Sequence, residues 1–181
     1  MRKLIFALPV LLIFARCSSP YTSEIAQLDS LLTLLDSAKT VLHKVDSGLI
    51  FQRKRASLHN MSVISTTTDT LTREDIFLLD TYASYSKGYK KWSTRIVALY
   101  EEVETIPMQL RNLKKDLSKN LIPTDKSAQY MRNESDMARL VIEAVFKLDE
   151  GVKRNNAPYI ETEEKILLLI QRLESQKQLE S

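Results

Sequence analysis

The residues best suited to ligand chemistry are aromatic side chains interleaved with lysines between positions 82 and 100. They are Tyr82, Tyr85, Tyr89, Trp92 and Tyr100, together with Lys87, Lys90 and Lys91. Aromatic rings beside cations can stack on sugar rings, or on bases in a basic groove. The same spacing also suits a packed helix face, with the Tyr hydroxyls and the Trp N–H at its rim. Two interpretations therefore stand: core packing, or a ligand or partner surface made of Tyr82, Tyr85, Tyr89, Trp92, Lys90 and Lys91.

No set of residues in the sequence has the pattern of a catalytic or metal site. His43 and His59 are sixteen positions apart, so they cannot chelate a metal from neighbouring turns of one helix. Glu101, Glu102 and Glu104 have lysines nearby and no indicated pocket, and no Gly-x-Ser-x-Gly elbow occurs. We therefore expect no enzymatic activity, no metal and no cofactor.

The positive charge of the chain is concentrated at its N-terminus. The sequence has 26 Lys plus Arg against 23 Asp plus Glu, a net charge of +3. Residues 1–16 hold Arg2, Lys3 and Arg16 and no acid, so their removal leaves 23 charges of each sign. A neutral mature protein gives no electrostatic reason for nucleic-acid binding, and we expect no nucleic-acid partner.

The N-terminal segment has the organisation of a secretory signal. A charged start at Met1-Arg2-Lys3 precedes an uncharged run from Leu4 to Ala15. That run is shorter than the roughly 20 residues that a membrane span needs. We therefore predict a signal peptide over residues 1–16, with a short N-terminal anchor or buried helix as the alternative.

The single cysteine, Cys17, stands where the apolar run ends. Its position resembles the lipobox of bacterial lipoproteins, with Ala15 fitting and Phe14 and Arg16 departing from the usual Leu at −3 and small residue at −1. The resemblance implies a lipid on Cys17, a tether over 17–21, and an outer membrane lipoprotein facing the periplasm, because Ser18 replaces the Asp of inner-membrane retention. Ordinary cleavage to a secreted or periplasmic soluble protein is the alternative.

The rest of the chain has helical periodicity throughout. Apolar residues from Leu28 to Leu49 predict a first helix over about 22–55. A second helix follows an unbroken heptad pattern from Leu78 to Leu117, with Thr72 and Asp75 as a weak capping box and Asn120 and Pro123 at its end. A third begins near Thr124, and Asn155-Asn156-Ala157-Pro158 interrupts it.

These lengths predict an all-α fold: an elongated, coiled-coil-like antiparallel three-helix bundle forming one domain over residues 22–181. The third arm is expected to break at Pro158, and the second helix to kink near Pro107. The hairpin 107–137 should extend past Tyr21. Its tip carries a local positive excess that could face anionic headgroups, or form a solvated helix face: Arg111, Lys114, Lys115, Lys119 and Lys126.

Taken together, the signal, Cys17, the Leu-rich first helix and the Tyr/Trp/Lys stretch resemble small helical envelope lipoproteins of Bacteroidota. The resemblance implies a location and a helical fold. We expect a lipid-anchored structural or interaction protein that binds itself or an envelope protein by helix packing. The alternative is a periplasmic binding module for a glycan, a cell-wall fragment or a small apolar ligand, using the Tyr82–Trp92 stripe.

Overall fold

The computed structural model describes residues 20–66 and 71–180. The predicted signal peptide and Cys17 lie outside the described residues. Within them the chain forms four α-helices and no strand: α1 (Thr22–Lys44), α2 (Ser47–Ser65), α3 (Arg73–Ser118) and α4 (Thr124–Glu180). The prediction of an all-α fold is confirmed. None of the described helices is both long and apolar enough to cross a membrane.

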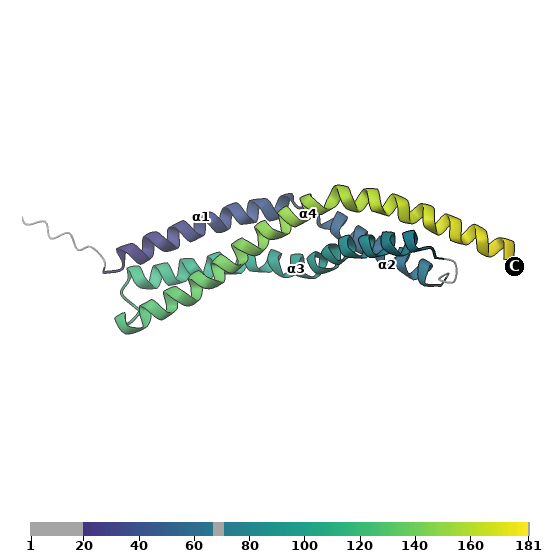
Figure 1. Cartoon of the computed structure of the whole chain (residues 1–181). Coiled ribbons are helices and arrows are strands. Elements are labelled where there is room, and N and C mark those ends of the chain that lie inside the picture. The colour runs from purple at the N-terminus through teal and green to yellow at the C-terminus, as the bar shows by residue number, and fades with distance from the viewer. Residues whose placement is uncertain (1–19, 67–70, 181) are drawn as a thin grey trace, which may run out of the picture.

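The four helices pack together into an elongated molecule (Figure 1). Helix α3 contacts α1, α2 and α4, and α4 also contacts α1 and α2. Ion pairs from Lys39 to Glu104 and from Asp29 to Lys114 show that α1 and α3 run antiparallel. The hydrogen bond from Asn60 to Tyr82 continues the same antiparallel register into α2. Helices α1 and α2 therefore follow one another along one side of α3.

The first predicted helix is two helices, because the backbone leaves the helical conformation at Val45 and Asp46. Val45 is extended, with φ −72° and ψ 124°, and Asp46 Oδ1 accepts the backbone N–H of Leu49 at 2.9 Å. That bond caps the N-terminus of α2. A Cβ on Gly48 would lie 3.2 Å from the same carboxylate oxygen, so glycine leaves room for the cap.

Helix α3 begins and ends at the residues that its sequence predicts. Thr72 and Asp75 form a complete capping box, in which the Thr72 side chain accepts from Asp75 N while the Asp75 side chain accepts from Thr72 N. After Ser118 the chain reverses at Asn120, whose φ of 53° lies in the left-handed region that asparagine tolerates. The helix is continuous through Pro107.

The predicted break at Pro158 is wrong, because α4 is a single helix from Thr124 to Glu180. Proline removes one backbone donor but does not end a helix whose two sides are both fixed by packing. Immediately after it, Tyr159 is fully buried. The Thr162 hydroxyl also donates to the Pro158 carbonyl over 2.7 Å, one turn along the helix.

The predicted extension of hairpin 107–137 past Tyr21 is also wrong. The Tyr21 hydroxyl donates to the Ile122 carbonyl at 3.2 Å, so the start of α1 is level with the α3–α4 turn (Figure 1). The first connection of the chain lies late, because α2 continues to Ser65 and α3 starts only at Arg73. Helices α1 and α2 therefore reach along the whole of α3.

The core is one continuous set of side chains along the molecule's axis. Leucines at three- and four-residue spacing supply it from α1, and the heptad positions supply it from α3. The seam of α3, from Tyr82 to Leu117, is thus covered by other helices of the same chain. Along this core, one level carries polar groups instead of aliphatic ones, where α2, α3 and α4 meet.

Candidate functional site

The polar level of the core is built around three tyrosine rings from two helices. Tyr82 and Tyr89 on α3 face Tyr159 on α4, with ring centroids 5.5 Å and 4.8 Å from that of Tyr159. All three residues have 0% exposure. Burial raises the pKa of Tyr82, Tyr89 and Tyr159, because the phenolate form loses its hydration. The three phenols are therefore neutral across the physiological range.

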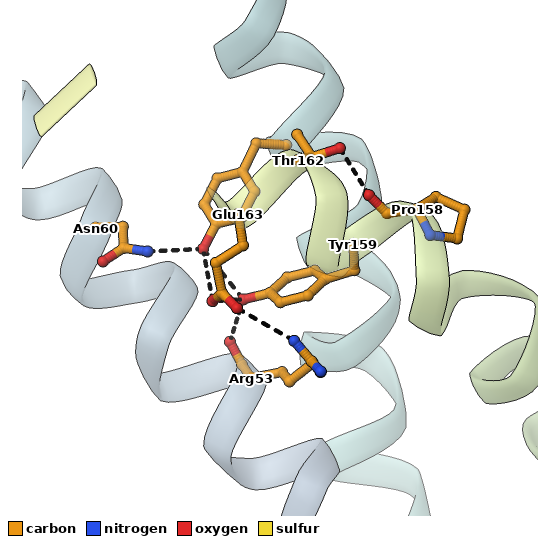
Figure 2. A network of polar contacts seen from close by, with 7 residues as sticks. Arg53, Asn60, Pro158, Tyr159, Thr162 and Glu163 are labelled. Carbon is orange, nitrogen blue, oxygen red and sulfur yellow. Dashed lines mark hydrogen bonds and ion pairs between the residues drawn. The ribbon is translucent and has the colours of Figure 1, made fainter. Parts of the chain in front are cut away.

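A chain of hydrogen bonds runs through this level from one helix to the next (Figure 2). Asn60 Nδ2 on α2 donates to Tyr82 Oη at 3.0 Å, and Tyr82 Oη lies 3.1 Å from Tyr159 Oη. Tyr159 Oη donates to Glu163 Oε1 at 2.7 Å. Since each phenol has one proton, the shortest bond fixes the direction: Asn60 donates to Tyr82, Tyr82 to Tyr159, and Tyr159 to Glu163.

The carboxylate at the end of this chain is paired with Arg53. Arg53 Nη1 on α2 lies 3.2 Å from Glu163 Oε2, and the two side chains are only 13% and 20% exposed. The guanidinium also lies over the Tyr159 ring, 4.7 Å from its centroid. An ion pair this enclosed needs the extra hydrogen bonds that Tyr159 provides, because both charges have lost most of their water.

The chemistry of this polar level is that of a specific helix contact. Its acid is held by a guanidinium and a phenol, and its phenols are enclosed by three helices. Catalysis by a carboxylate or phenol requires access to a substrate. The arrangement instead fixes which residues of α2, α3 and α4 meet, since any shift in register would leave buried polar groups without partners.

The only tryptophan lies one turn further along α3, against two of the three glycines. A Cβ on Gly88 would lie 2.9 Å from the Trp92 ring, and a Cβ on Gly151 of α4 would lie 2.6 Å from it. Real Cβ atoms do not approach so closely, so both positions need glycine for the indole to fit. The edge of Tyr89 meets the same ring at 5.2 Å.

Trp92 forms part of a groove between α3 and α4 with a volume of about 640 Å³. Ala144 and Leu148 add apolar surface to it, and charged residues surround that surface: Lys91, Arg95, Lys147, Glu150 and Arg154. Arg95 is held by Glu102 through two 2.7 Å hydrogen bonds. A groove of this size with a partly exposed indole is of the kind that binds small ligands.

The predicted aromatic surface is divided by the structure between the core and the groove. Tyr82 and Tyr89 are buried, so the core interpretation is correct for these two, and they cannot line a surface in this fold. Trp92 and Tyr85 are half-buried, and only Trp92 lines the groove. Lys90 and Lys91 are exposed, on the two sides of α3.

The predicted basic tip lies at the α3–α4 end, but charges from α1 and α4 offset it. Lys114 is paired with Asp29 of α1. Arg111, Lys115, Lys119 and Lys126 are exposed. Asp116 of α3 and Glu134 of α4 line one hollow at this end, and Asp125 precedes Lys126 in the chain. The positive excess seen along one hairpin of the sequence therefore has nearby counter-charges in the folded chain.

Sequence reasoning did not find Arg53, Asn60, Tyr159 and Glu163 as a group. Treating Pro158 as a helix break removed Tyr159 from any core pattern. A helix continued through Pro158 would have placed Tyr159 on the same face as Ile166 and Leu173, which are buried. No family model, no curated protein and no solved structure matches this chain.

Proposed function

We propose that this chain is a non-enzymatic, lipid-anchored structural or interaction protein of the bacterial cell envelope, held at the outer membrane and facing the periplasm. The observation that carries the proposal is the position of Tyr21 at one extreme end of the molecule, beside the α3–α4 turn. A lipid on Cys17, four residues earlier in the chain, would hold the molecule by that end.

In this proposal the four helices form an elongated antiparallel three-helix bundle, with α1 and α2 in series as one arm and α3 bent near Pro107. The 57 residues of α4 correspond to about 85 Å of helix. A rod of that length, held at one end, would carry side surfaces well away from the membrane. The enclosed polar level supports a structural role, because it sets helix register and is closed to substrates.

The partner surface we propose is an exposed apolar row on α4. Ile160, Leu167 and Leu168 share one helix face, and they are 38%, 46% and 65% exposed. The α3 seam, which motivates self-association in the sequence, is already filled within the chain. The α4 row is therefore the better candidate for helix packing with an envelope protein or a second copy.

The experiment is cross-linking in cells followed by co-purification of the full chain. Replacing Ile160, Leu167 and Leu168 with Gln should remove a specific cross-linked species. The matched control replaces Leu34, Leu58 and Val97, exposed apolar residues on three other helix faces, and should leave that species unchanged. A strictly monomeric protein that recovers no envelope partner would refute the interaction role.

A second candidate function is supported by the Trp92 groove. Its size and its half-buried indole favour a binding module for a glycan, a cell-wall fragment or a small apolar ligand. Trp92 is the only tryptophan, so its fluorescence reports on the groove directly. Quenching of Trp92 fluorescence by cell-wall fragments would support this function, and emission insensitive to every such fragment would exclude it.

A further inference from the structure

Two segments that pack against each other contain charges of one sign only. Helix α2 and residues 81–100 of α3 hold seven Lys or Arg and no Asp or Glu: Arg53, Lys54, Arg55, Lys87, Lys90, Lys91 and Arg95. The rest of the chain from Cys17 onward has 16 basic and 23 acidic residues. The neutrality of the predicted mature sequence therefore combines a positive charge on these two segments with a negative charge on the rest of the chain.

Most of these cations form no ion pair with a carboxylate of the described residues. Arg53 is paired with Glu163, and Arg95 with Glu102. Among the described residues, no carboxylate lies within 4.0 Å of the other five: Lys54, Arg55, Lys87, Lys90 and Lys91. The neighbouring acids of α4 are used within their own helix, as in the pairs of Asp149 with Lys153 and Glu150 with Arg154.

The unpaired lysines stand beside two grooves on the sides of α3. The α2–α3 groove has a volume of about 370 Å³, with Leu58, Met61 and Ala83 as its apolar surface and Lys54, Lys87 and Lys90 around it. On the other side of α3, Lys91 lines the groove that contains Trp92. We call α2, residues 81–100 of α3 and these two grooves the basic face.

We propose that the basic face binds a linear acidic polysaccharide. Its unpaired ammonium groups match the repeated carboxylate or sulfate groups of such a polymer, and they extend along the helices as a polymer does. Lys54 of α2 lines the same groove as Lys87 and Lys90 of α3, and Lys91 lies one helical turn from Lys87. The indole of Trp92 and the apolar strip at Leu58 offer flat surfaces to the C–H faces of sugar rings.

The choice of a polysaccharide over a nucleic acid rests on the proposed envelope location, where exported proteins meet acidic glycans. The charge separation and the two grooves do not depend on that location or on the lipid. Failure of lipid attachment at Cys17 and failure of polysaccharide binding are therefore separate results, obtained by different measurements on the same protein.

The test measures binding of polygalacturonate to the full chain in nonionic detergent, with neutral dextran and single-stranded oligo-dT as comparison polymers. Polygalacturonate should bind, dextran should not, and affinity should fall as salt rises. The variant Lys54→Gln/Lys87→Gln/Lys90→Gln should weaken binding by about tenfold or more, because three unpaired charges are lost together. The matched variant Lys115→Gln/Lys119→Gln/Lys126→Gln at the tip should bind as the unchanged protein does.

Three results would overturn the proposal: no binding of polygalacturonate, equal weakening by both triple variants, or tighter binding of oligo-dT than of polygalacturonate. Helical circular dichroism of each variant checks that the fold is retained. Lys87 and Lys90 are exposed, so Lys87→Gln and Lys90→Gln tested singly replace the triple variant if it loses helicity. Each single change should then weaken binding measurably more than Lys119→Gln does.

Discussion

The hydroxyl of Tyr159 donates to Oε1 of Glu163 over 2.7 Å, across one turn of α4. This bond joins the Arg53–Glu163 ion pair to the tyrosines of α3, and so connects three helices at one level of the core. Aliphatic side chains on either side can slide past one another at little cost, whereas hydrogen-bonded partners have one arrangement. The polar level therefore fixes the register of α2, α3 and α4.

We predict that Tyr159→Phe destabilises the fold by about 1–3 kcal/mol. The substitution removes the phenol that donates to Glu163 and that accepts from Tyr82, so the enclosed carboxylate loses its shortest hydrogen bond and keeps its ion pair with Arg53. The free energy of unfolding, measured by urea denaturation, should fall while helical content at zero urea is kept. An unchanged midpoint would show that this hydrogen-bond chain contributes nothing to stability.

The matched substitution Tyr89→Phe should be neutral or should stabilise the fold by up to about 1 kcal/mol. The Tyr89 hydroxyl is buried without a hydrogen-bond partner among the described residues. Removing it takes away the cost of its desolvation and leaves the ring contacts with Trp92 and Tyr159 in place. A loss as large as that of Tyr159→Phe would contradict the difference that we assign to the two hydroxyls.

We predict that Gly151→Ala destabilises the contact between α3 and α4 by about 1–3 kcal/mol. The added Cβ would lie 2.6 Å from the Trp92 ring and would push the indole into the groove. Thermal unfolding should shift to lower temperature and the Trp92 emission should move to the red. In Gly151→Ala/Trp92→Ala the clash is absent, so the combined cost should be smaller than the two single costs added together.

The capping box of α3 gives the fold a dependence on acidity. Burial alone would raise the pKa of Asp75, but its hydrogen bonds to Thr72 and the charge of Arg172, 2.5 Å away, outweigh burial and lower the pKa below its ordinary 3.8. A carboxyl with a lowered pKa stabilises the fold above that ordinary value and loses its contribution as pH falls through the folded-state pKa.

Asp75→Asn should therefore reduce the free energy of unfolding at pH 7 and reduce it less at pH 3, where the unfolded chain already holds most of its Asp protons. Urea titrations of both proteins at the two pH values measure this difference. Equal losses at the two pH values would mean that the charge of Asp75 is irrelevant to the cap and to Arg172. Asp125→Asn, at an exposed position of α4, provides the control.

The parts of the fold that depend on local pattern could be predicted from the sequence. Heptad spacing located the α3 core, and Thr72 with Asp75 located its start. The division of α1 from α2 was missed because the apolar spacing continues across Val45, so the only local signal is the capping side chain of Asp46. Pro158 predicts a break that does not occur, since packing of Tyr159 holds the helix through it.

The candidate site could be predicted only in part, because it depends on which helices meet. The sequence indicates one aromatic stripe on α3, but the burial of Tyr82 and Tyr89 and the position of Trp92 in the groove follow from where α4 lies. The absence of acids from residues 47–65 and 81–100 is visible in the sequence. That these two segments form one basic surface follows only from the packing of α2 on α3.

The central claim, a rod held to the envelope by a lipid at its Tyr21 end, is tested most directly by metabolic labelling with a fatty acid in bacterial cells. The account predicts that the full chain incorporates label and is recovered with the outer membrane, and that Cys17→Ala incorporates none and is released from that membrane. A mature protein that begins beyond Cys17, or that carries no label at Cys17, would contradict it.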